Sequence, residues 1–275
     1  MINKLNFLTA GIPLRTKPKD YDNAFRVLEE MQLDGIELEF VHGVRMSANS
    51  QKTVKRASKD FVITAHGPYY INLNSKEQEK VDASVTRIID TALITDKVGG
   101  YSITYHAAFY MGKDKEAVFK KVVDETQRII DVIEKEGVNV WIRPETTGKG
   151  TQWGDLDEVI NLSKEFKQVL PCIDFSHLHA RCGGGVNEYK DFCNILERVG
   201  NEIGQYALDN FHGHLAGIAY SEKGEKHHLE LEKSDMNYKD LLRALKKFNV
   251  KGALICESPN IEDDCKLIKE HYLSI

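Results

Sequence analysis

LPCIDFSHLHAR (residues 170–181) is the most informative stretch of the sequence. An apolar, strand-like run, Val169–Ile173, ends at Asp174, and His177 follows three residues later. At this spacing, a bend or a single helical turn brings both side chains to one face. Carboxylate and imidazole side chains are the ligands of divalent ions in catalytic sites. The stretch therefore predicts a buried strand that ends in two metal-type residues.

The same arrangement recurs along the chain. Five further strand-like runs end at or just before a histidine or glutamate: Phe61–Ala65 with His66, Ser102–Tyr105 with His106, Asn139–Ile142 with Glu145, Asn210–Gly213 with His214, and Ala253–Cys256 with Glu257. In a parallel barrel the C-terminal ends of the strands converge on one mouth, where barrel enzymes carry their chemistry. The recurrence predicts one shared site.

Strand-like and helix-like segments alternate eight times. The other two strand-like runs are Leu5–Thr9 and Gly35–Phe40, and the helix-like segments are Tyr21–Met31, Gln51–Lys59, Glu77–Val98, Lys115–Gly137, Leu156–Phe166, Glu188–Ile203, Tyr238–Phe248 and Ile261–Leu273. Strands separated by helices pair in parallel, because each crossover returns over the sheet. We expect an α/β fold, a single (β/α)8 TIM barrel over residues 1–275, with the metal site at the C-terminal strand ends; an open doubly wound sheet is the alternative.

Composition restricts the class of protein. A charge of −5 excludes a strongly basic nucleic-acid binder, although bound cations would allow a local basic rim around an acidic pocket. No apolar stretch reaches membrane-spanning length, and the N-terminus lacks a signal peptide. Five scattered cysteines indicate a reducing, cytoplasmic setting. The long connection Leu215–Asn237 suggests a functional loop.

Two glutamates have the clearest catalytic pattern. Glu145 and Glu257 each follow an apolar strand with a proline close by, where an acid is costly to bury unless it is paired or metal-bound. We predict that they are the catalytic carboxylates. His212 and His214 alternate in one strand and share its face, and His214 is the one expected to reach the mouth.

The candidate ligands mix imidazole with carboxylate and lack thiolate. This set suits zinc, manganese or iron in a catalytic site. It also exceeds the number of ligands that one ion uses, which points to two or three ions that share a carboxylate and favours phosphoester hydrolysis. No Walker A or Rossmann glycine pattern is present, so we expect no nucleotide cofactor.

Six motifs resemble, in order, those of the endonuclease IV family within the xylose isomerase-like metal-dependent TIM barrels. They are HGPYYINL, RPETTGKG, PCIDFSH, HGHL, GEKHHLEL and CESP, between about residues 61 and 260. The resemblance implies a trinuclear zinc site, with manganese or iron as other candidates. It also implies a base-excision-repair enzyme that cleaves damaged double-stranded DNA 5′ to abasic sites through a metal-bound hydroxide. We expect a monomer.

The resemblance also implies the ligands of each ion. The first ion would take His66, His106 and Glu145, the second Glu145, Asp174, His214 and Glu257, and the third His177 and His228. One departure concerns the third ion. The family has an aspartate two residues before the loop histidine, where this chain has Lys226. Either Glu225 reaches the third ion together with His228, or that site is altered or empty.

Four residues are candidates for DNA binding. Tyr69 matches the position of an aromatic residue that the family inserts into the duplex at the lesion. Arg45, Lys149 and Arg181 lie near strand ends, where they can contact phosphates, although each also suits a solvated surface.

Two other functions are open. A xylose isomerase-like sugar isomerase or epimerase would use one divalent ion on Glu145, Asp174, His214 and Glu257, and would leave the remaining histidines without a common purpose. A catalytically inactive barrel that binds nucleic acid or a partner is the third possibility. The number of intact ligands argues against it, because unused buried charges are destabilising.

Overall fold

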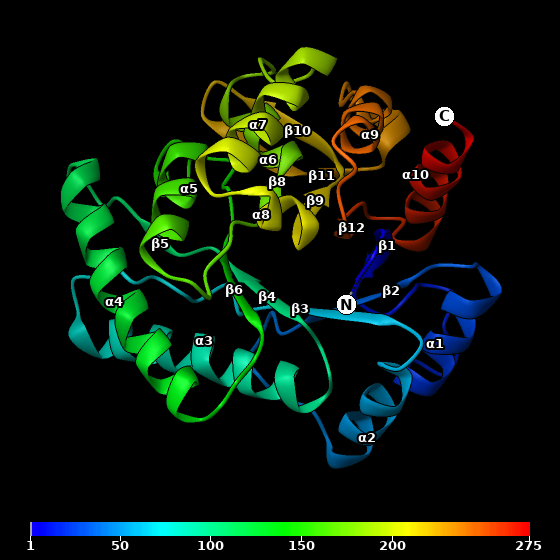
Figure 1. The fold of residues 1–275 in the computed structure, drawn as a ribbon, viewed down its shortest axis with the longest axis horizontal. Helices are drawn as coiled ribbons and strands as arrows, with labels where there is room; N and C mark the ends of the chain where they lie inside the picture. Colours follow the sequence, from blue (N-terminus) through cyan, green and yellow to red (C-terminus); the bar gives the residue numbers. More distant parts are fainter. Residues whose placement is uncertain (1) are drawn as a thin grey trace.

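The computed structural model describes residues 2–275, which form an eight-stranded sheet with helices packed around it (Figure 1). The strands of the sheet are β1 (Leu5–Ala10), β2 (Gly35–Glu39), β3 (Val62–His66), β4 (Ser102–Tyr105), β6 (Trp141–Pro144), β8 (Ile173–Asp174), β9 (Phe211–Leu215) and β12 (Gly252–Cys256). The helices are α1 (Tyr21–Glu30), α2 (Ala48–Ala57), α3 (Gln78–Lys97), α4 (Lys115–Lys135), α5 (Leu156–Glu165), α6 (Phe175–Arg181), α7 (Tyr189–Glu202), α8 (Gln205–Asp209), α9 (Tyr238–Lys247) and α10 (Glu262–Ser274). Two short ladders lie outside the sheet, β5 (Ala108–Phe109) with β7 (Gln152–Trp153) and β10 (Gly217–Ser221) with β11 (Gly224–Leu229).

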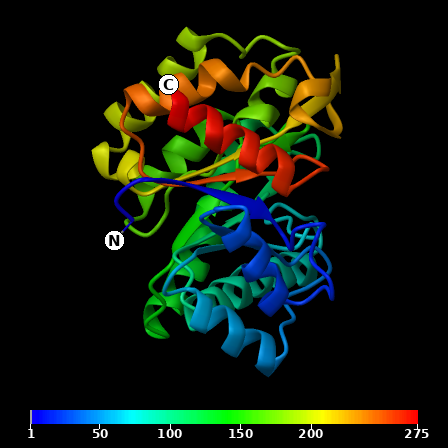
Figure 2. The same ribbon diagram turned by 90° about the vertical axis from the view of Figure 1, so that its right-hand side faces the viewer.

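The sheet closes into a barrel. Its order is β6-β4-β3-β2-β1-β12-β9-β8, and all of these pairs are parallel. At the two ends of this order, Ile142 N donates to Gln168 O (3.0 Å) and Cys172 N donates to Pro144 O (3.0 Å). These bonds join β6 to the segment that leads into β8. Figure 2 shows the last helix, α10, beside the first strand, β1. The (β/α)8 barrel expected from the sequence is confirmed.

The apolar core lies mainly outside the barrel wall. Ile36 and Leu38 of β2 belong to the large core formed with the helices, whereas Leu8, Ala253 and Ile255 form a small separate cluster. In a typical barrel of this type, bulky branched residues fill the interior. Here fully buried polar side chains take much of that role: Glu37, Thr64, Ser102, Arg143, Cys172 and His212.

Two segments differ from the sequence expectation. The connection Leu215–Asn237 contains an antiparallel hairpin, β10–β11, and a short 3₁₀ turn, η1 (Leu231–Lys233). An additional helix, α6, begins directly after β8, because Asp174 Oδ1 accepts a hydrogen bond from His177 N (2.6 Å) and caps the helix. Within residues 2–275, no helix is long and apolar enough to cross a membrane.

Arg143 is the cation of the barrel interior, and its loss should destabilise the fold. Its guanidinium donates to Ser102 Oγ (2.6 Å), Pro171 O (3.0 Å) and Asn210 O. Burial lowers the pKa of Arg143 to about 10, so the side chain stays charged at neutral pH. Arg143→Leu leaves these acceptors unpaired, and we expect the free energy of unfolding to fall by about 3–5 kcal/mol.

Urea denaturation measures this change. The exposed Arg26, which bonds only to Asn23 on its own helix, provides the control. Arg26→Leu should change the free energy of unfolding by no more than about 0.5 kcal/mol. Equal effects of the two substitutions would contradict a special role for Arg143.

Candidate metal centre

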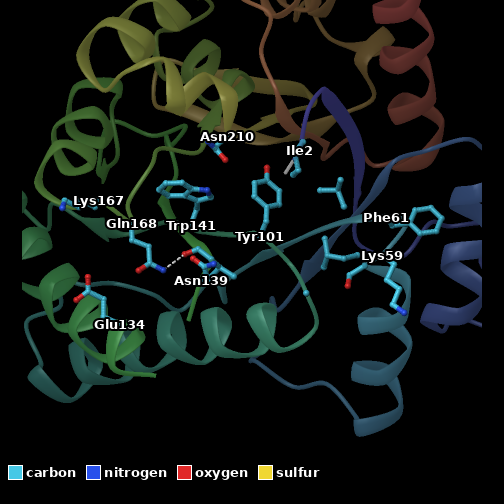
Figure 3. Close-up of a pocket in the computed structure, with 15 residues that line it drawn as sticks. Ile2, Lys59, Phe61, Tyr101, Glu134, Asn139, Trp141, Lys167, Gln168 and Asn210 are labelled. Carbon is cyan, nitrogen blue, oxygen red and sulfur yellow. Dashed lines mark hydrogen bonds between the residues drawn. The ribbon is translucent and has the colours of Figure 1, made fainter. Parts of the chain in front are cut away.

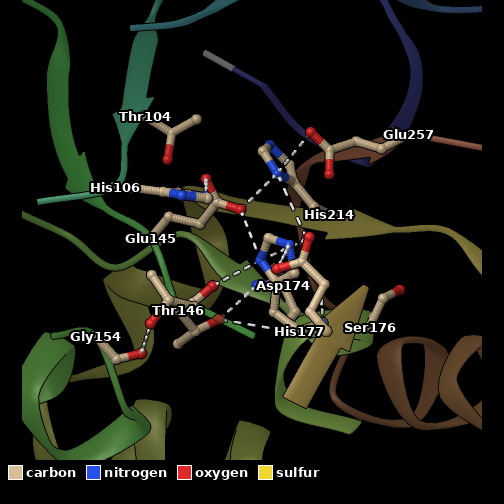
Figure 4. Close-up of polar contacts among 12 residues, drawn as sticks. Thr104, His106, Glu145, Thr146, Gly154, Asp174, Ser176, His177, His214 and Glu257 are labelled. Atoms are coloured by element: carbon tan, nitrogen blue, oxygen red, sulfur yellow. Dashed lines mark hydrogen bonds and ion pairs between the residues drawn. The ribbon is translucent and has the colours of Figure 1, made fainter. Parts of the chain in front are cut away.

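The ligand-type residues expected from the sequence meet at one end of the barrel. His66 and Asp174 are the last residues of β3 and β8, and His214 lies one residue before the end of β9. Glu145 and Glu257 come directly after β6 and β12. The structure brings these side chains together with His106, which follows β4 (Figure 4).

Glu145 lies at the centre of the cluster. Its carboxylate is fully buried, and its two oxygens face different histidines. Oε2 is 3.1 Å from His66 Nε2 and 3.3 Å from His106 Nε2. Oε1 is 3.2 Å from both His214 Nδ1 and His177 Nδ1. A carboxylate that faces two sets of nitrogens in this way is suited to bridge two ions.

In the described part of the chain, four groups of ligand-type atoms are close enough to hold an ion each; one, Cys172, His212 and His214, reaches into the barrel interior, and the other three lie at the mouth. The three sets at the mouth are His66, His106 and Glu145; Glu145, Asp174, His214 and Glu257; and Asp174, His177 and His228. Within each set the ligand atoms all lie within 4.8 Å of one another. Glu145 is shared by the first two sets and Asp174 by the last two. The sets therefore form one continuous centre.

A β-bulge brings Glu225 to the third set. In the β10–β11 hairpin, Ala219 pairs with His227 and Tyr220 with Glu225, so Lys226 has no residue opposite. The extra residue resets the alternation of side chains along the strand. Lys226 and His227 are consequently exposed, while Glu225 Oε2 lies 3.6 Å from His177 Nε2. The ring centroids of His177 and His228 are 5.7 Å apart.

The hairpin rests on a loop that only glycine permits. Glu225 N donates to Gly148 O (2.9 Å), and a Cβ on Gly148 would lie 2.6 Å from the Cβ of Glu225. Arg181 holds the same loop, because its guanidinium donates to Lys149 O (2.6 Å) and to Gln152 O (3.1 Å). The sequence suggested Arg181 as a phosphate contact. In the structure its guanidinium donates to main-chain carbonyls of this loop instead.

The centre is charged in a way that suits cations. Burial alone disfavours protonated rings, but Glu145 and Glu39 raise the pKa of His66, and Asp174 and Glu145 raise that of His177, to about 10 in each case. Burial would raise the pKa of Glu145, yet His106 and His214 hold it well below its usual value. Burial raises the pKa of Glu257 to about 8. Without an ion, protons must therefore balance the charge.

Two observations test whether divalent ions fit these residues. Asp174 Oδ2 is buried and accepts no hydrogen bond from any described residue, so it lacks a partner that a cation would supply. From the Glu145 oxygens to the facing nitrogens of His66, His106 and His214, the distances run from 3.1 to 3.3 Å. Ligand atoms about 2.1 Å from a tetrahedral ion lie roughly 3.4 Å apart. The residues fit.

Sequence reasoning missed two acids of the interior. Glu37 is fully buried, and Glu39, at the end of β2, has a buried Oε1 without a hydrogen-bond partner among the described residues. Burial raises the pKa of Glu39 to about 7. The alternation of acidic and apolar residues in Ile36-Glu-Leu-Glu-Phe40 is the sequence signal for them. In a strand covered on both faces, alternating acids must point into the barrel.

The remaining candidates lie around the rim. Tyr69 is 63% exposed, and its ring centroid is 6.0 Å from that of His66. Arg45 is exposed in the loop after β2, and Lys149 is half-buried beside the hairpin. His179 is buried away from the ligand sets, with Nε2 3.2 Å from Asp235 Oδ1.

A large cavity lies at the opposite end of the barrel. Its volume is about 790 Å³, and Tyr101, Trp141 and Asn210, which precede β4, begin β6 and precede β9, contribute to its wall (Figure 3). None of the ligand sets found in residues 2–275 uses a residue of this wall. The N-terminal ends of barrel strands serve stability rather than chemistry. We therefore assign the candidate site to the mouth.

Ion binding should release protons. With a pKa of about 10, His66 and His177 are protonated at pH 7 in the ion-free protein, and each ring must lose a proton to bind an ion. We expect at least three protons to be released per chain when zinc binds at pH 7, two from these rings and one from the Glu257 carboxyl, whose pKa is about 8, and the apparent affinity to rise with pH. Isothermal titration calorimetry of EDTA-treated protein in buffers of different ionisation enthalpy measures this number.

The same shifts fix the pH dependence of the ion-free fold. A raised histidine pKa adds stability that is complete below the ordinary value of 6.5 and is lost as the pH rises through about 10. As the pH rises from 6.5 to about 10, the ion-free protein should therefore become less stable, whereas its affinity for zinc should rise. Zinc binding without proton release would contradict the protonated state of both rings.

Comparisons with known proteins agree with this architecture. A family profile described as xylose isomerase-like TIM barrel matches residues 25–271. An uncharacterized protein of Methanocaldococcus jannaschii is 44% identical over 268 residues, covering 98% of this chain and 97% of the relative. A probable endonuclease 4 of Bacillus subtilis is 28% identical over 148 residues, which is 52% of this chain and 48% of that protein.

Solved structures with two different activities share the fold. A D-tagatose 3-epimerase-like protein has a TM-score of 0.75 at 17% identity, with 98% of this chain and 97% of the other covered. Endonuclease IV from Thermus thermophilus has a TM-score of 0.74 at 16% identity, with 99% and 100% covered. At such identities the likeness concerns the fold alone. The profile match over most of the chain shows that this protein belongs to the xylose isomerase-like TIM barrel family.

Proposed function

We propose that this chain is a metal-dependent phosphodiesterase that cleaves DNA 5′ to abasic sites, like endonuclease IV. The observation that carries the proposal is the sharing of Glu145 and Asp174 among three ligand sets. Such sharing favours two or three ions, with zinc the first candidate and manganese or iron the others. Divalent ions would supply an activated water and offset the charge of the attacked phosphate and its leaving oxygen.

The protein's own residues organise this chemistry. Glu145 faces the first two sets with separate oxygens and keeps them at a fixed separation. Glu257 Oε1 lies 3.3 Å from His214 Nδ1 and completes the second set on the open side of the mouth. Both carboxylates are held at the ends of strands, which are more rigid than loops.

Substrate binding is assigned to the rim. Tyr69 and its neighbour Tyr70 are both exposed directly after β3, where their rings can stack against bases around a lesion. Arg45 and Lys149 add positive charge on two other loops, suited to contact phosphates. An abasic sugar is cheap to flip out of the duplex, since no base pair has to be broken.

A sugar isomerase or epimerase is the second candidate function. The set Glu145, Asp174, His214 and Glu257 is sufficient for one divalent ion, and the two glutamates could move protons at adjacent carbons. This function gives no common purpose to His66, His106, His177 and His228. The number of ions per chain therefore separates the two candidates.

Nicking of abasic DNA is the direct test. We expect the zinc-loaded protein to nick plasmid containing abasic sites, and excess EDTA to stop the reaction. Glu145→Gln, which removes the shared charge, should reduce the rate on the order of 100- to 1000-fold. Glu158→Gln is the control, because Glu158 is also a buried glutamate but bonds to Tyr110 and to the start of α5.

A different set of results would favour the epimerase. They are one ion per chain by elemental analysis, together with turnover of a ketose and no nicking by fully loaded protein. Glu145→Gln should then abolish the sugar reaction instead.

Glu225 determines whether the third set binds an ion. We expect Glu225→Gln to reduce the zinc content of dialysed protein by about one ion per chain, because the third set loses its additional carboxylate. His227→Gln is the matched control, since His227 lies on the same strand but is exposed. Equal zinc contents of Glu225→Gln, His227→Gln and the unchanged protein would show that Glu225 is not a ligand.

A further inference from the structure

A layer of polar residues lies directly beneath the ligands. Each member except Ser102 precedes a residue of the mouth by two positions, and Ser102 precedes His106 by four, so each points to the same side of its strand as that residue. The layer consists of Glu37, Thr64, Ser102, Arg143, Cys172 and His212, all fully buried. It meets the metal centre at His214, whose Nε2 is 3.0 Å from Glu37 Oε1 and 3.3 Å from His212 Nε2.

Hydrogen-bond donors and acceptors in this layer form a single chain. Arg143 Nε donates to Ser102 Oγ (2.6 Å), so the Ser102 hydroxyl is free to donate to His212 Nδ1 (2.9 Å). His212 then carries its proton on Nε2, which is 3.0 Å from Glu37 Oε2. Thr64 Oγ1 donates to the same oxygen (2.7 Å). Glu37 Oε2 is thus well supplied with donors.

The other oxygen of Glu37 needs a donor that only His214 is placed to give. Oε1 is buried and has no hydrogen-bond partner among the described residues, although His214 Nε2 lies 3.0 Å from it. His214 Nδ1 faces the second ligand set, 3.2 Å from Glu145 Oε1 and 3.3 Å from Glu257 Oε1. If Nδ1 binds an ion, the proton of the ring must lie on Nε2. The Nε2 proton of His214 is therefore placed to be donated to Glu37 Oε1.

This arrangement sets His214 apart from other ligand histidines. His66, His177 and His228 each have Nδ1 within hydrogen-bond distance of a main-chain carbonyl: Gly67 O (2.7 Å), Thr146 O (3.0 Å) and Glu257 O (3.1 Å). A carbonyl oxygen is neutral, whereas Glu37 carries a full charge. Carboxylates behind metal-bound histidines fix the ring and raise its basicity as a ligand.

We propose that Glu37 is a positioning residue of the metal centre, which holds His214 with Nδ1 toward Glu145, Asp174 and Glu257 and strengthens ion binding there. The inference rests on the metal centre of the proposed function but not on its substrate. Arg143 and His212 keep the carboxylate in place from below. Cys172 and His212 also have ligand-type atoms within 4.8 Å of His214, but both nitrogens of His212 already face polar partners, Ser102 Oγ at 2.9 Å and Glu37 Oε2 at 3.0 Å.

Zinc affinity tests the role of Glu37. We expect Glu37→Gln to lower the affinity for one zinc ion by about 10- to 100-fold in competition with a chromophoric chelator, while the number of ions at saturating zinc stays unchanged. Glu125→Gln is the control, since Glu125 is a buried glutamate on α4 that pairs only with Lys121 and Arg128. Unchanged zinc affinity of a folded Glu37→Gln protein would overturn the proposal. A lower ion count at saturation would also overturn it, because Glu37 would then be a ligand.

A second measurement requires no substitution at Glu37. Nitrogen-15 NMR of the zinc-loaded protein distinguishes a ring protonated on Nε2 from one protonated on Nδ1, and the His214 signals are those absent in His214→Asn. We expect Nε2 protonation for His214 and Nδ1 protonation for His66 and His177. Nδ1 protonation of His214 would refute the assignment. DNA takes part in neither experiment, so both results can be interpreted even if the protein does not nick DNA. If the unchanged protein bound no zinc, the metal centre itself would be refuted.

Discussion

Charge compensation inside the barrel is the constraint on which this structure depends. Glu37 and Glu145 are fully buried on the inner face of the wall, where an unpaired carboxylate would be far too costly. Arg143 provides a permanent cation near the bottom of the interior, and histidines provide adjustable charge toward the mouth. Toward the mouth, the balance of the buried negative charge therefore depends increasingly on protons or bound ions. A chain that buried these acids without the histidines would not form a stable barrel.

The same constraint explains how much the sequence could predict. Alternation of strands and helices was sufficient for the barrel, because parallel pairing follows from the crossovers. The convergence of candidate ligands at the strand ends could be predicted because Asp174, Glu145 and Glu257 interrupt apolar runs. Glu37 could not be found by that rule, since it lies within a strand whose apolar neighbours conceal it. Its role depends on which residue lies opposite, and His212 and His214 are about 175 positions away along the chain.

The position of Glu225 in the β10–β11 hairpin could not be predicted from the sequence either. Spacing along the chain placed Lys226 where an acid was expected, and a regular strand would have pointed Glu225 and His228 to opposite faces. The bulge between Ala219 and Tyr220 removes this conflict by leaving Lys226 without a partner. Such a bulge depends on cross-strand register, and also on the close approach of Gly148, neither of which a single sequence displays. Motif spacing therefore underestimates the ligands that a folded strand can present.

The two candidate functions differ in the number of ligand sets that they would use. One set at a strand-end mouth creates a single Lewis acid, suited to moving protons on a sugar; sets that share carboxylates create adjacent ions, suited to a phosphate with several charged oxygens. In this chain Glu145, one sharing residue, pairs with Cys172, which precedes Asp174, the other sharing residue, by two positions. Closure of the barrel at that seam determines their separation. The step that completes the fold is thus also the step that brings the sets together, so the stability of the seam and the function of the site cannot be varied independently.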